Sequence, residues 1–235
     1  MSIICLEGNI AAGKSTLAKA LSEALNYRVF MEPVVQNPYL ELFYQNPKKW
    51  ALDLQIWIFK QRAETYCRAL QHMQSTGQGV ILDRSVFSDI VFAWTCTEDD
   101  SINKEGFAEY MKLRNDTLAT LPLPSLVLYL DVIPSTCHYR IMNVRKRACE
   151  SGIPLGYLQA LDRNYKRFLI EMDTTENVPV HVVDWTEFKS CQYVMEGLSQ
   201  YQMASLSPVV PKASSITSVL NMLSSHQQVS VTTED

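Results

Sequence analysis

The 235-residue chain lacks several features that would assign it to a specialised class of protein. It has no basic excess, because 21 Lys and Arg residues stand against 25 Asp and Glu residues and give a net charge of −4. The overall charge therefore indicates neither a nucleic-acid partner nor a membrane partner. It also has no uninterrupted apolar run long enough to cross a bilayer.

Cysteine motifs are also absent. The six cysteines form no C-x-x-C pair and have no His at metal-binding spacing. This pattern favours reduced, buried thiols over a disulfide framework, and so predicts a reducing compartment. The chain starts directly with the strand-like run SIICLE, so we expect no signal or transit peptide. The expected location is the cytoplasm, with entry into the nucleus as a further possibility.

The sequence does contain the alternation of strands and helices that is typical of an α/β protein. Hydrophobic residues make up 47% and charged residues 20%, as in an ordinary globular domain. Apolar runs predict five parallel strands at 3–7, 27–32, 79–83, 126–131 and 180–184, and several of these runs are nearly continuous, as in strands buried on both faces of a sheet. Helices are predicted at 14–26, 48–76, 85–95, 105–120, 134–150, 154–172 and 186–202. We therefore expect a five-stranded parallel sheet flanked by helices, with ligands at the carboxyl ends of the strands.

Composition divides the chain near residue 203. Residues 1–203 are predicted to form one domain. Residues 204–235 are rich in Ser, Thr, Val and Pro, contain no Phe, Trp or Tyr, and predict a mostly disordered tail in which ITSVLNML could form a short helix. The helix at 48–76 is unusually apolar from Trp50 onward. Burial in the core and a dimer interface explain this stretch equally well.

The stretch GNIAAGKS, from Gly8 to Ser15, matches the phosphate-binding pattern G-x-x-x-x-G-K-[ST]. A strand precedes it and an amphipathic helix follows, which favours a phosphate cradle over a simple glycine turn. Lys14 would reach the β- and γ-phosphates, and the Ser15 hydroxyl would bind Mg²⁺. The expected ligand is a nucleoside triphosphate with Mg²⁺. The expected donor-binding residues are Gly8, Asn9, Ala11, Ala12, Gly13, Lys14, Ser15 and Thr16.

The next two predicted strands also end in charged residues. Glu32, in EPV, is placed to act as a base, although an exposed loop acid is the alternative. In LDRS, Asp83 would help Ser15 to organise Mg²⁺, and Arg84 would bind the acceptor or stabilise charge on the transferred phosphoryl group. The alternative for this pair is an Asp that caps a helix beside a surface Arg.

Two further sets of polar residues are candidates. Gln55, Ile58 and Arg62 fall on one stripe of the long predicted helix, where a nucleobase could satisfy the amide and Asp89 could pair with the arginine. The alternative is a polar helix edge. Three arginines, 140, 145 and 147, precede GIPLGYL and could form a lid over the triphosphate. A solvated basic helix face is the alternative for this set.

Five segments, EGNIAAGKST, EPV, FYQNPKKWALDLQ, DRSVFSD and RKRACESGIPLGYL, occur in one order across residues 3–200. In this order they resemble the deoxyribonucleoside kinases, and most closely the purine deoxynucleoside kinases. The resemblance implies a P-loop kinase fold with an arginine-rich lid and transfer of phosphate from ATP-Mg to a sugar 5′-hydroxyl. It also implies a homodimer, which we place at the apolar helix that begins near Trp50.

The resemblance also implies residue roles. Lys14, Glu32 and Arg84 would be catalytic, with Glu32 as the base and Arg84 on the 5′-oxygen. Tyr44 and Glu150 would hold the 3′-hydroxyl, Gln55 would bind the base edge, and Phe92 would stack on the base. Asp83 stands where animal members have Glu. The spacing from Arg140 to Arg145 is one residue longer than in the family.

Substrate preference follows from the expected pair of Arg62 with Asp89, which in this family accompanies purine or deoxycytidine substrates. We therefore expect deoxyadenosine or deoxyguanosine first, deoxycytidine second and thymidine last. A broad-specificity or thymidine-accepting kinase is the alternative. A nucleoside-monophosphate kinase is disfavoured by EPV and by the Gln55 stripe. The fold also resembles a catalytically silent scaffold subunit, but Lys14, Glu32 and Arg84 are all present.

Overall fold

A computed structural model describes residues 2–32, 37–147, 150–201 and 213–225. Its centre is a five-stranded parallel sheet with the strand order β2-β3-β1-β4-β5. The strands are β1 (Ile3–Gly8), β2 (Arg28–Phe30), β3 (Val80–Asp83), β4 (Leu126–Asp131) and β5 (Val180–Asp184). Residues of β1 and β3 are buried throughout, as expected for strands covered on both faces. The predicted fold class is confirmed.

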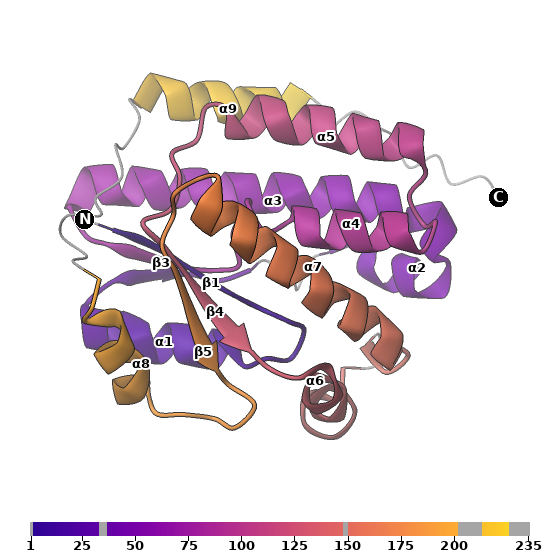
Figure 1. Cartoon of the computed structure of the whole chain (residues 1–235). Helices are drawn as coiled ribbons and strands as arrows, with labels where there is room; N and C mark the ends of the chain where they lie inside the picture. Colours follow the sequence, from indigo (N-terminus) through magenta and orange to yellow (C-terminus); the bar gives the residue numbers. More distant parts are fainter. Residues whose placement is uncertain (1, 33–36, 148–149, 202–212, 226–235) are drawn as a thin grey trace.

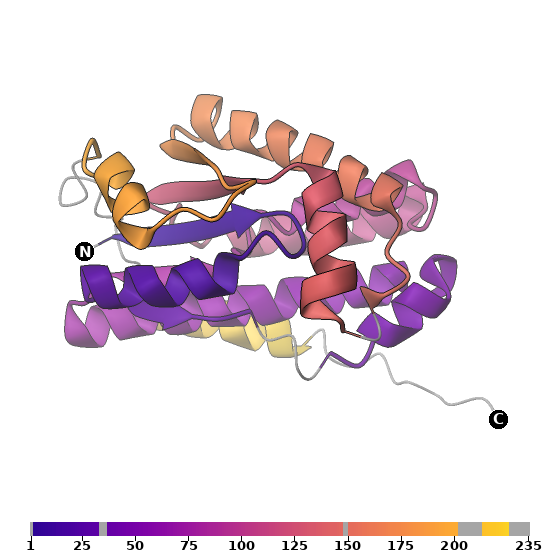
Figure 2. The ribbon, with the colours of Figure 1, turned by 90° about the horizontal axis from the view of Figure 1, so that it is seen from below.

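Helices cover both faces of this sheet (Figures 1 and 2). They are α1 (Lys14–Leu25), α2 (Leu40–Gln45), α3 (Pro47–Thr76), α4 (Ile90–Glu98), α5 (Lys104–Leu118), α6 (Pro134–Arg140), α7 (Leu155–Thr174), α8 (Cys191–Leu198) and α9 (Ala213–Ser225), with one π-helix, η1 (Ile141–Arg145). On one face lie α1 and α8, and on the other lie α3, α4 and α7 (Figure 1). A further layer, formed by α5 and α9, packs on the outer side of α3. Among the described residues, no helix is both long and apolar enough to cross a membrane.

Several predicted helices begin or end elsewhere. The helix expected at 85–95 starts only at Ile90, because Arg84 adopts a left-handed conformation (φ 71°) and a turn follows it. The helix expected at 134–150 changes at residue 141 from α6 to the wider turn of η1. The helix expected from 186 begins at 191, where the Ser190 side chain accepts a hydrogen bond from the Tyr193 backbone N–H. The short α2 was not predicted.

The part of the predicted tail that the structure describes is helical, as ITSVLNML suggested. Residues 213–225 form α9, which packs on α3 and buries the side chains of Ile216, Val219 and Leu223. The helix suggested by ITSVLNML is therefore present and is longer than that segment. Residues 202–212 and 226–235 lie outside the described residues, so the domain boundary near 203 stays a prediction.

The apolar start of α3 finds cover within the chain. Ala51, Leu54 and Phe59 are buried, and Trp50 and Ile58 are half-buried. The neighbouring α2 and α5 supply part of this cover. Burial in the core therefore accounts for Ala51, Leu54 and Phe59, whereas Trp50 and Ile58 keep part of their surface exposed, so a dimer interface at this helix stays a prediction.

Candidate active site

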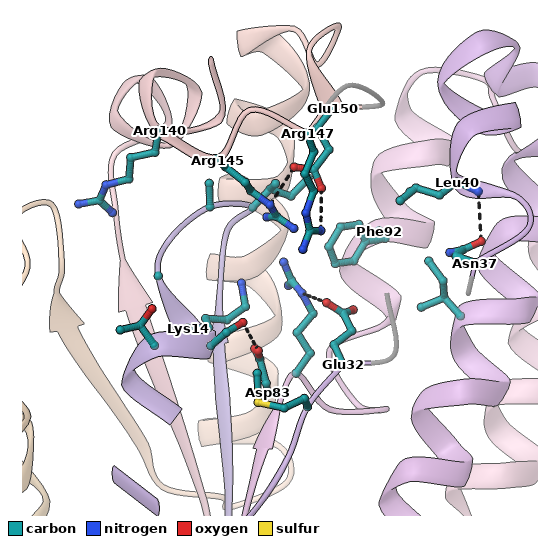
Figure 3. Close-up of a pocket in the computed structure, with 18 of the residues that line it drawn as sticks. Lys14, Glu32, Asn37, Leu40, Asp83, Phe92, Arg140, Arg145, Arg147 and Glu150 are labelled. Atoms are coloured by element: carbon teal, nitrogen blue, oxygen red, sulfur yellow. Dashed lines mark hydrogen bonds and ion pairs between the residues drawn. The ribbon is translucent and has the colours of Figure 1, made fainter. Parts of the chain in front are cut away.

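One pocket lies at the carboxyl ends of β1, β2 and β3, with a cavity volume of about 560 Å³ (Figure 3). This volume is within the range of small-molecule sites. The lining residues come from the glycine-rich loop, α2, α3, the ends of β2 and β3, and the segment from α6 to Glu150. They include Lys14, Ser15, Glu32, Tyr44, Ile58, Arg62, Asp83, Arg84, Phe92, Arg140, Arg145, Arg147 and Glu150. The structure thus brings most of the predicted site residues into one cavity.

The glycine-rich loop joins β1 to α1 and has the backbone that its sequence predicts. Gly8 and Gly13 both have positive φ, 149° and 104°. A side chain on Gly8 would lie 2.9 Å from the Leu130 carbonyl oxygen, so glycine is required there. Because α1 begins at Lys14, its free N–H groups and positive dipole end face the loop. The loop is therefore suited to bind phosphate.

Lys14 folds back over this loop. Its Nζ donates hydrogen bonds to the carbonyl oxygens of Gly8 at 3.0 Å and Asn9 at 2.9 Å. Burial, together with the nearby Arg84, lowers the pKa of Lys14 to about 7. A phosphate bound in the loop would supply the negative charge that favours the protonated amine.

Ser15 and Asp83 meet at the base of the pocket. The Ser15 Oγ donates a hydrogen bond to Asp83 Oδ2 at 2.5 Å, and the buried Asp83 Oδ1 has no hydrogen-bond partner among the described residues. Among all the residues that the structure describes, no group of three or more His, Cys, Asp or Glu side chains could hold a metal ion. One hydroxyl and one carboxylate suit Mg²⁺, which commonly takes its other ligands from water and substrate phosphates. These two residues therefore fit the predicted magnesium site.

Glu32 lies between two arginines. Its Oε1 accepts a hydrogen bond from Arg62 Nε at 3.2 Å and also contacts Arg62 Nη2, and its Oε2 accepts one from Arg84 Nε at 3.2 Å. Burial opposes the charged form, but the two guanidinium groups outweigh it and hold the pKa of Glu32 at about 2. With 22% of its side chain exposed, Glu32 presents an ionised carboxylate to the cavity. Pro33 and Val34 of the EPV motif lie outside the described residues.

Arg84 is held on several sides. Its Nη1 donates to the Gly8 carbonyl oxygen at 3.1 Å and to the Tyr165 hydroxyl, and its guanidinium lies 5.0 Å from the Phe92 ring centre. Tyr165 is fully buried on α7, and the sequence did not single it out. An aromatic residue at helical spacing looks like any core residue. Only the folded structure shows that it contacts the candidate catalytic arginine.

Asp89 is the centre of a buried network behind this site. Its carboxylate accepts from Arg62 Nη1 at 2.6 Å, from the Tyr110 hydroxyl at 2.8 Å and from Gln55 Nε2 at 2.5 Å. The expected pairing of Arg62 with Asp89 is therefore present. Gln55, by contrast, is not among the residues that line the cavity, because Asp89 binds its amide NH₂ group. Tyr110, on α5, was not predicted.

The lid arginines divide into two groups (Figure 3). Arg145 Nε and Arg147 Nη1 both form ion pairs with the buried Glu150, at 3.0 and 3.3 Å. Arg140 points away from them and donates to the carbonyl oxygens of Ala12 at 3.2 Å and Thr186 at 2.8 Å. The π-turn η1 separates the groups, because its wider turn holds one residue more than an α-turn. The extra residue in the sequence spacing thus has a structural explanation.

The loop after β5 adds residues that the sequence reasoning missed. Phe188 lines the cavity, is 66% exposed, and lies 4.2 Å from the Arg140 guanidinium. The Trp185 Nε1 is buried without a hydrogen-bond partner among the described residues, and both rings approach Gly13. A flat, partly exposed ring beside a phosphate loop can stack on a planar group. No sequence motif marks this loop.

Comparisons with known proteins agree with this geometry. The family model described as deoxynucleoside kinase matches residues 4–200. Deoxyguanosine kinase from Dictyostelium discoideum is 48% identical over 197 residues, which are 84% of this chain and 68% of that protein. Deoxyadenosine kinase from the same organism is 35% identical over 185 residues, 79% of this chain and 73% of that protein.

Two further proteins are also similar to this chain. The mitochondrial NADH dehydrogenase [ubiquinone] 1 alpha subcomplex subunit 10 from Bos taurus is 33% identical over 192 residues, 72% of this chain and 56% of that protein. The structure of deoxyadenosine kinase from M. mycoides with bound dATP superposes with a TM-score of 0.71 at 26% identity, covering 85% of this chain and all of that one. Because the family model spans most of the sequence and two deoxynucleoside kinases share a third or more of its aligned residues, the chain belongs to the deoxynucleoside kinase family.

Proposed function

We propose that this kinase transfers the γ-phosphate of ATP-Mg to the 5′-hydroxyl of purine deoxyribonucleosides. The observation that carries the proposal is the meeting of three strand ends in one cavity. There, Lys14 and Ser15 follow β1, Glu32 follows β2, and Asp83 with Arg84 closes β3. Lys14 and Ser15 suit the binding of a triphosphate. Glu32 and Asp83 add carboxylates beside it, and Arg84 adds a guanidinium.

The proposed transfer assigns one task to each group. Glu32 takes the proton of the 5′-hydroxyl as that oxygen forms a bond to the γ-phosphorus and the bond to the β-phosphate oxygen breaks, leaving ADP. Arg84 stabilises charge at the transferred group, and Lys14 with the start of α1 binds the β- and γ-phosphates. Mg²⁺ held by Ser15 and Asp83 would neutralise charge on the phosphate oxygens.

The acceptor is proposed to lie along α3. Tyr44 and Glu150, which line the cavity, would bind the 3′-hydroxyl, and Ile58 with Phe92 would flank the base. Gln55 and Asp89 would act from the buried network that fixes Arg62. On the donor side, Arg140 and Phe188 would enclose the base of ATP. Tyr44, Ile58, Phe92 and Glu150 all line the same cavity, which supports their part of the proposal.

Purine preference is supported by the pairing of Arg62 with Asp89 and by two relatives whose names are deoxyguanosine kinase and deoxyadenosine kinase. Since the deoxyguanosine kinase is the more similar of the two, we place deoxyguanosine ahead of deoxyadenosine. Deoxycytidine follows, and thymidine is last.

A radiolabelled phosphate-transfer assay with ATP and Mg²⁺ across the four deoxynucleosides tests the function. We expect transfer to deoxyguanosine and deoxyadenosine, and little to thymidine. Lys14→Ala serves as the negative control, and deoxynucleoside monophosphates serve as alternative acceptors. Thymidine as the best substrate would overturn the purine assignment. Absence of transfer to every nucleoside would overturn the kinase function in favour of a scaffold.

We also propose a homodimer in the cytoplasm. The apolar helix that begins near Trp50 is the proposed interface, and light scattering of the purified chain tests the dimer. A monomeric mass at micromolar concentration would contradict it. Fractionation of cells that express the full chain tests the location, and recovery in mitochondria would contradict it.

A further inference from the structure

Glu7 is a buried carboxylate that no step of the proposed transfer uses. It lies on β1 directly before Gly8 and has no exposed surface. Its Oε1 accepts hydrogen bonds from the Ser85 backbone N–H at 2.8 Å and from Ser85 Oγ at 2.7 Å. Its Oε2 has no hydrogen-bond partner among the described residues. Burial raises the pKa of this carboxyl above its ordinary value, although Arg84, Ser85, Ser88 and Arg62 oppose the shift. A buried acid with an unpartnered oxygen requires an explanation.

The bonds from Glu7 end on a strained turn. Arg84 has φ of 71°, a left-handed conformation that a long side chain rarely adopts and that persists only when its surroundings enforce it. The turn is fixed on both sides of this residue by β1. Before it, the Arg84 backbone N–H donates to the Leu6 carbonyl oxygen at 3.0 Å. After it, Glu7 binds both hydrogen-bond donors of Ser85.

This turn positions two functional side chains at once. Asp83 meets Ser15 on one side, and Arg84 reaches Glu32 and the Gly8 carbonyl oxygen on the other. If Ser85 were released, the backbone of Arg84 could relax towards an ordinary conformation. The guanidinium would then leave its place between the glycine-rich loop and Glu32.

We propose that Glu7 is a positioning residue that acts through Ser85 to hold Arg84 at the site of phosphoryl transfer. The proposal rests on the proposed function, because it concerns the rate of that transfer. Its distinctive feature is that Glu7 has no exposed surface and does not line the cavity, so it would touch neither substrate. Its removal should therefore change kcat far more than the binding of either substrate.

Steady-state kinetics of Glu7→Ala, Glu7→Gln and Ser85→Ala test this directly. Misplacement of a group by about 1 Å costs about 10²-fold in rate, so we expect a loss of this order in kcat for Glu7→Ala. The Kd values for donor and acceptor, measured by titration, should change by less than about threefold. Glu7→Gln should recover most of the rate, because an amide oxygen can accept the same two hydrogen bonds. Glu23→Ala, on the exposed face of α1, is the matched control.

A double-mutant cycle separates positioning from a general structural role. In an Arg84→Ala background, Glu7→Ala should lower kcat by less than about twofold, because its target is already gone. An equal loss in both backgrounds, or a loss confined to Kd, would overturn the proposal. If Glu7→Ala does not fold, Ser85→Ala replaces it in the cycle. Absence of transfer by the wild type would instead contradict the proposed function itself.

Discussion

At the scale of single residues, the site is a set of opposed charges at close range. Glu32 touches two guanidinium groups, Arg62 touches two carboxylates, and Arg84 touches Glu32 and a backbone carbonyl oxygen. In a buried setting, each of these groups depends on its partners, because removing one leaves the others charged and unpaired. Substitutions here are therefore expected to alter chemistry and stability together, and the two effects must be measured separately.

Glu32→Gln is expected to lower kcat by about 10²–10⁴-fold, the usual contribution of general base catalysis. Nucleoside Kd, measured by titration, should change little. Since the Glu32 pKa is about 2, the carboxylate keeps its charge from about pH 5 to 8 and should add no inflection to the pH–rate profile there. Unchanged turnover of Glu32→Gln would contradict its role as the base. Glu41→Gln, at an exposed position of α2, is the control and should leave turnover unchanged.

Lys14 should make donor binding depend on pH. Its pKa is about 7 in the free protein, and a bound triphosphate stabilises the protonated form and so raises that pKa. Affinity for MgATP is therefore full below pH 7 and falls above it, by at most about tenfold per pH unit. Isothermal titration between pH 7 and 9 measures this change. A flat profile in the wild type would contradict it, and Lys14→Met should be flat.

The residues that sequence could identify share one property: they stand at the end of a predicted strand or inside a known spacing. Lys14, Glu32 and Arg84 meet that condition, because parallel strands end at the same edge of the sheet. Tyr165 and Tyr110 do not, since each is one aromatic among many on an amphipathic helix. Their importance comes from a contact more than 20 residues away in sequence. Such contacts arise from tertiary packing alone.

At the scale of elements, the π-helix η1 determines which groups the three arginines contact. By widening the helix for one turn, it leaves Arg140 buried against the glycine-rich loop and sends Arg145 and Arg147 towards Glu150. The three arginines, which the sequence grouped as one lid, therefore form two groups with different contacts. Spacing showed the irregularity, but its cause is visible only in the backbone.

Arg140→Ala should therefore destabilise the fold, whereas Arg147→Ala should not. Arg140 binds three carbonyl oxygens, of Ala12, Trp185 and Thr186, and its loss leaves them unpaired at a cost of about 1–3 kcal/mol. Arg147 is 42% exposed, so its ion pair contributes at most about 1 kcal/mol. Urea unfolding measures both, and titration should show weaker MgATP binding for Arg147→Ala. Equal stability losses would contradict this division.

At the scale of the whole molecule, a large apolar core joins the layers, and a smaller cluster lies around Phe43, Leu54 and Ile102. The large core contains β1, the inner faces of α3 and α7, and Ile216, Val219 and Leu223 of α9. The sequence suggested a helix in ITSVLNML, but the packing of this helix on α3 could not be predicted, because its three buried apolar residues lie in a segment rich in Ser and Thr. The helix lies beyond residues 4–200, which the family model matches.

Unfolding should accordingly be a single transition that includes α9. The four tryptophans, at 50, 57, 94 and 185, report on α3, α4 and the end of β5, so their fluorescence should change together with far-ultraviolet circular dichroism. Ile216→Ala should lower the free energy of unfolding by about 2–4 kcal/mol, and the two signals should give the same value. Ser218→Ala, at an exposed position, is the control. A separate early step, or no effect of Ile216→Ala, would contradict a shared core.

The strand order has a consequence for synthesis. Strand β1 precedes the other four strands in the sequence and lies between β3 and β4, which end at residues 83 and 131. The glycine-rich loop therefore emerges from the ribosome long before β3 and β4. At a synthesis rate of about 5–20 residues per second, several seconds pass before β4 is complete. Until β4 pairs with it, the nascent chain has the motif for binding ATP without the surface that shapes it. The capacity to bind nucleotide is thus a late property of the growing chain, although its signature precedes β3 and β4 in the sequence.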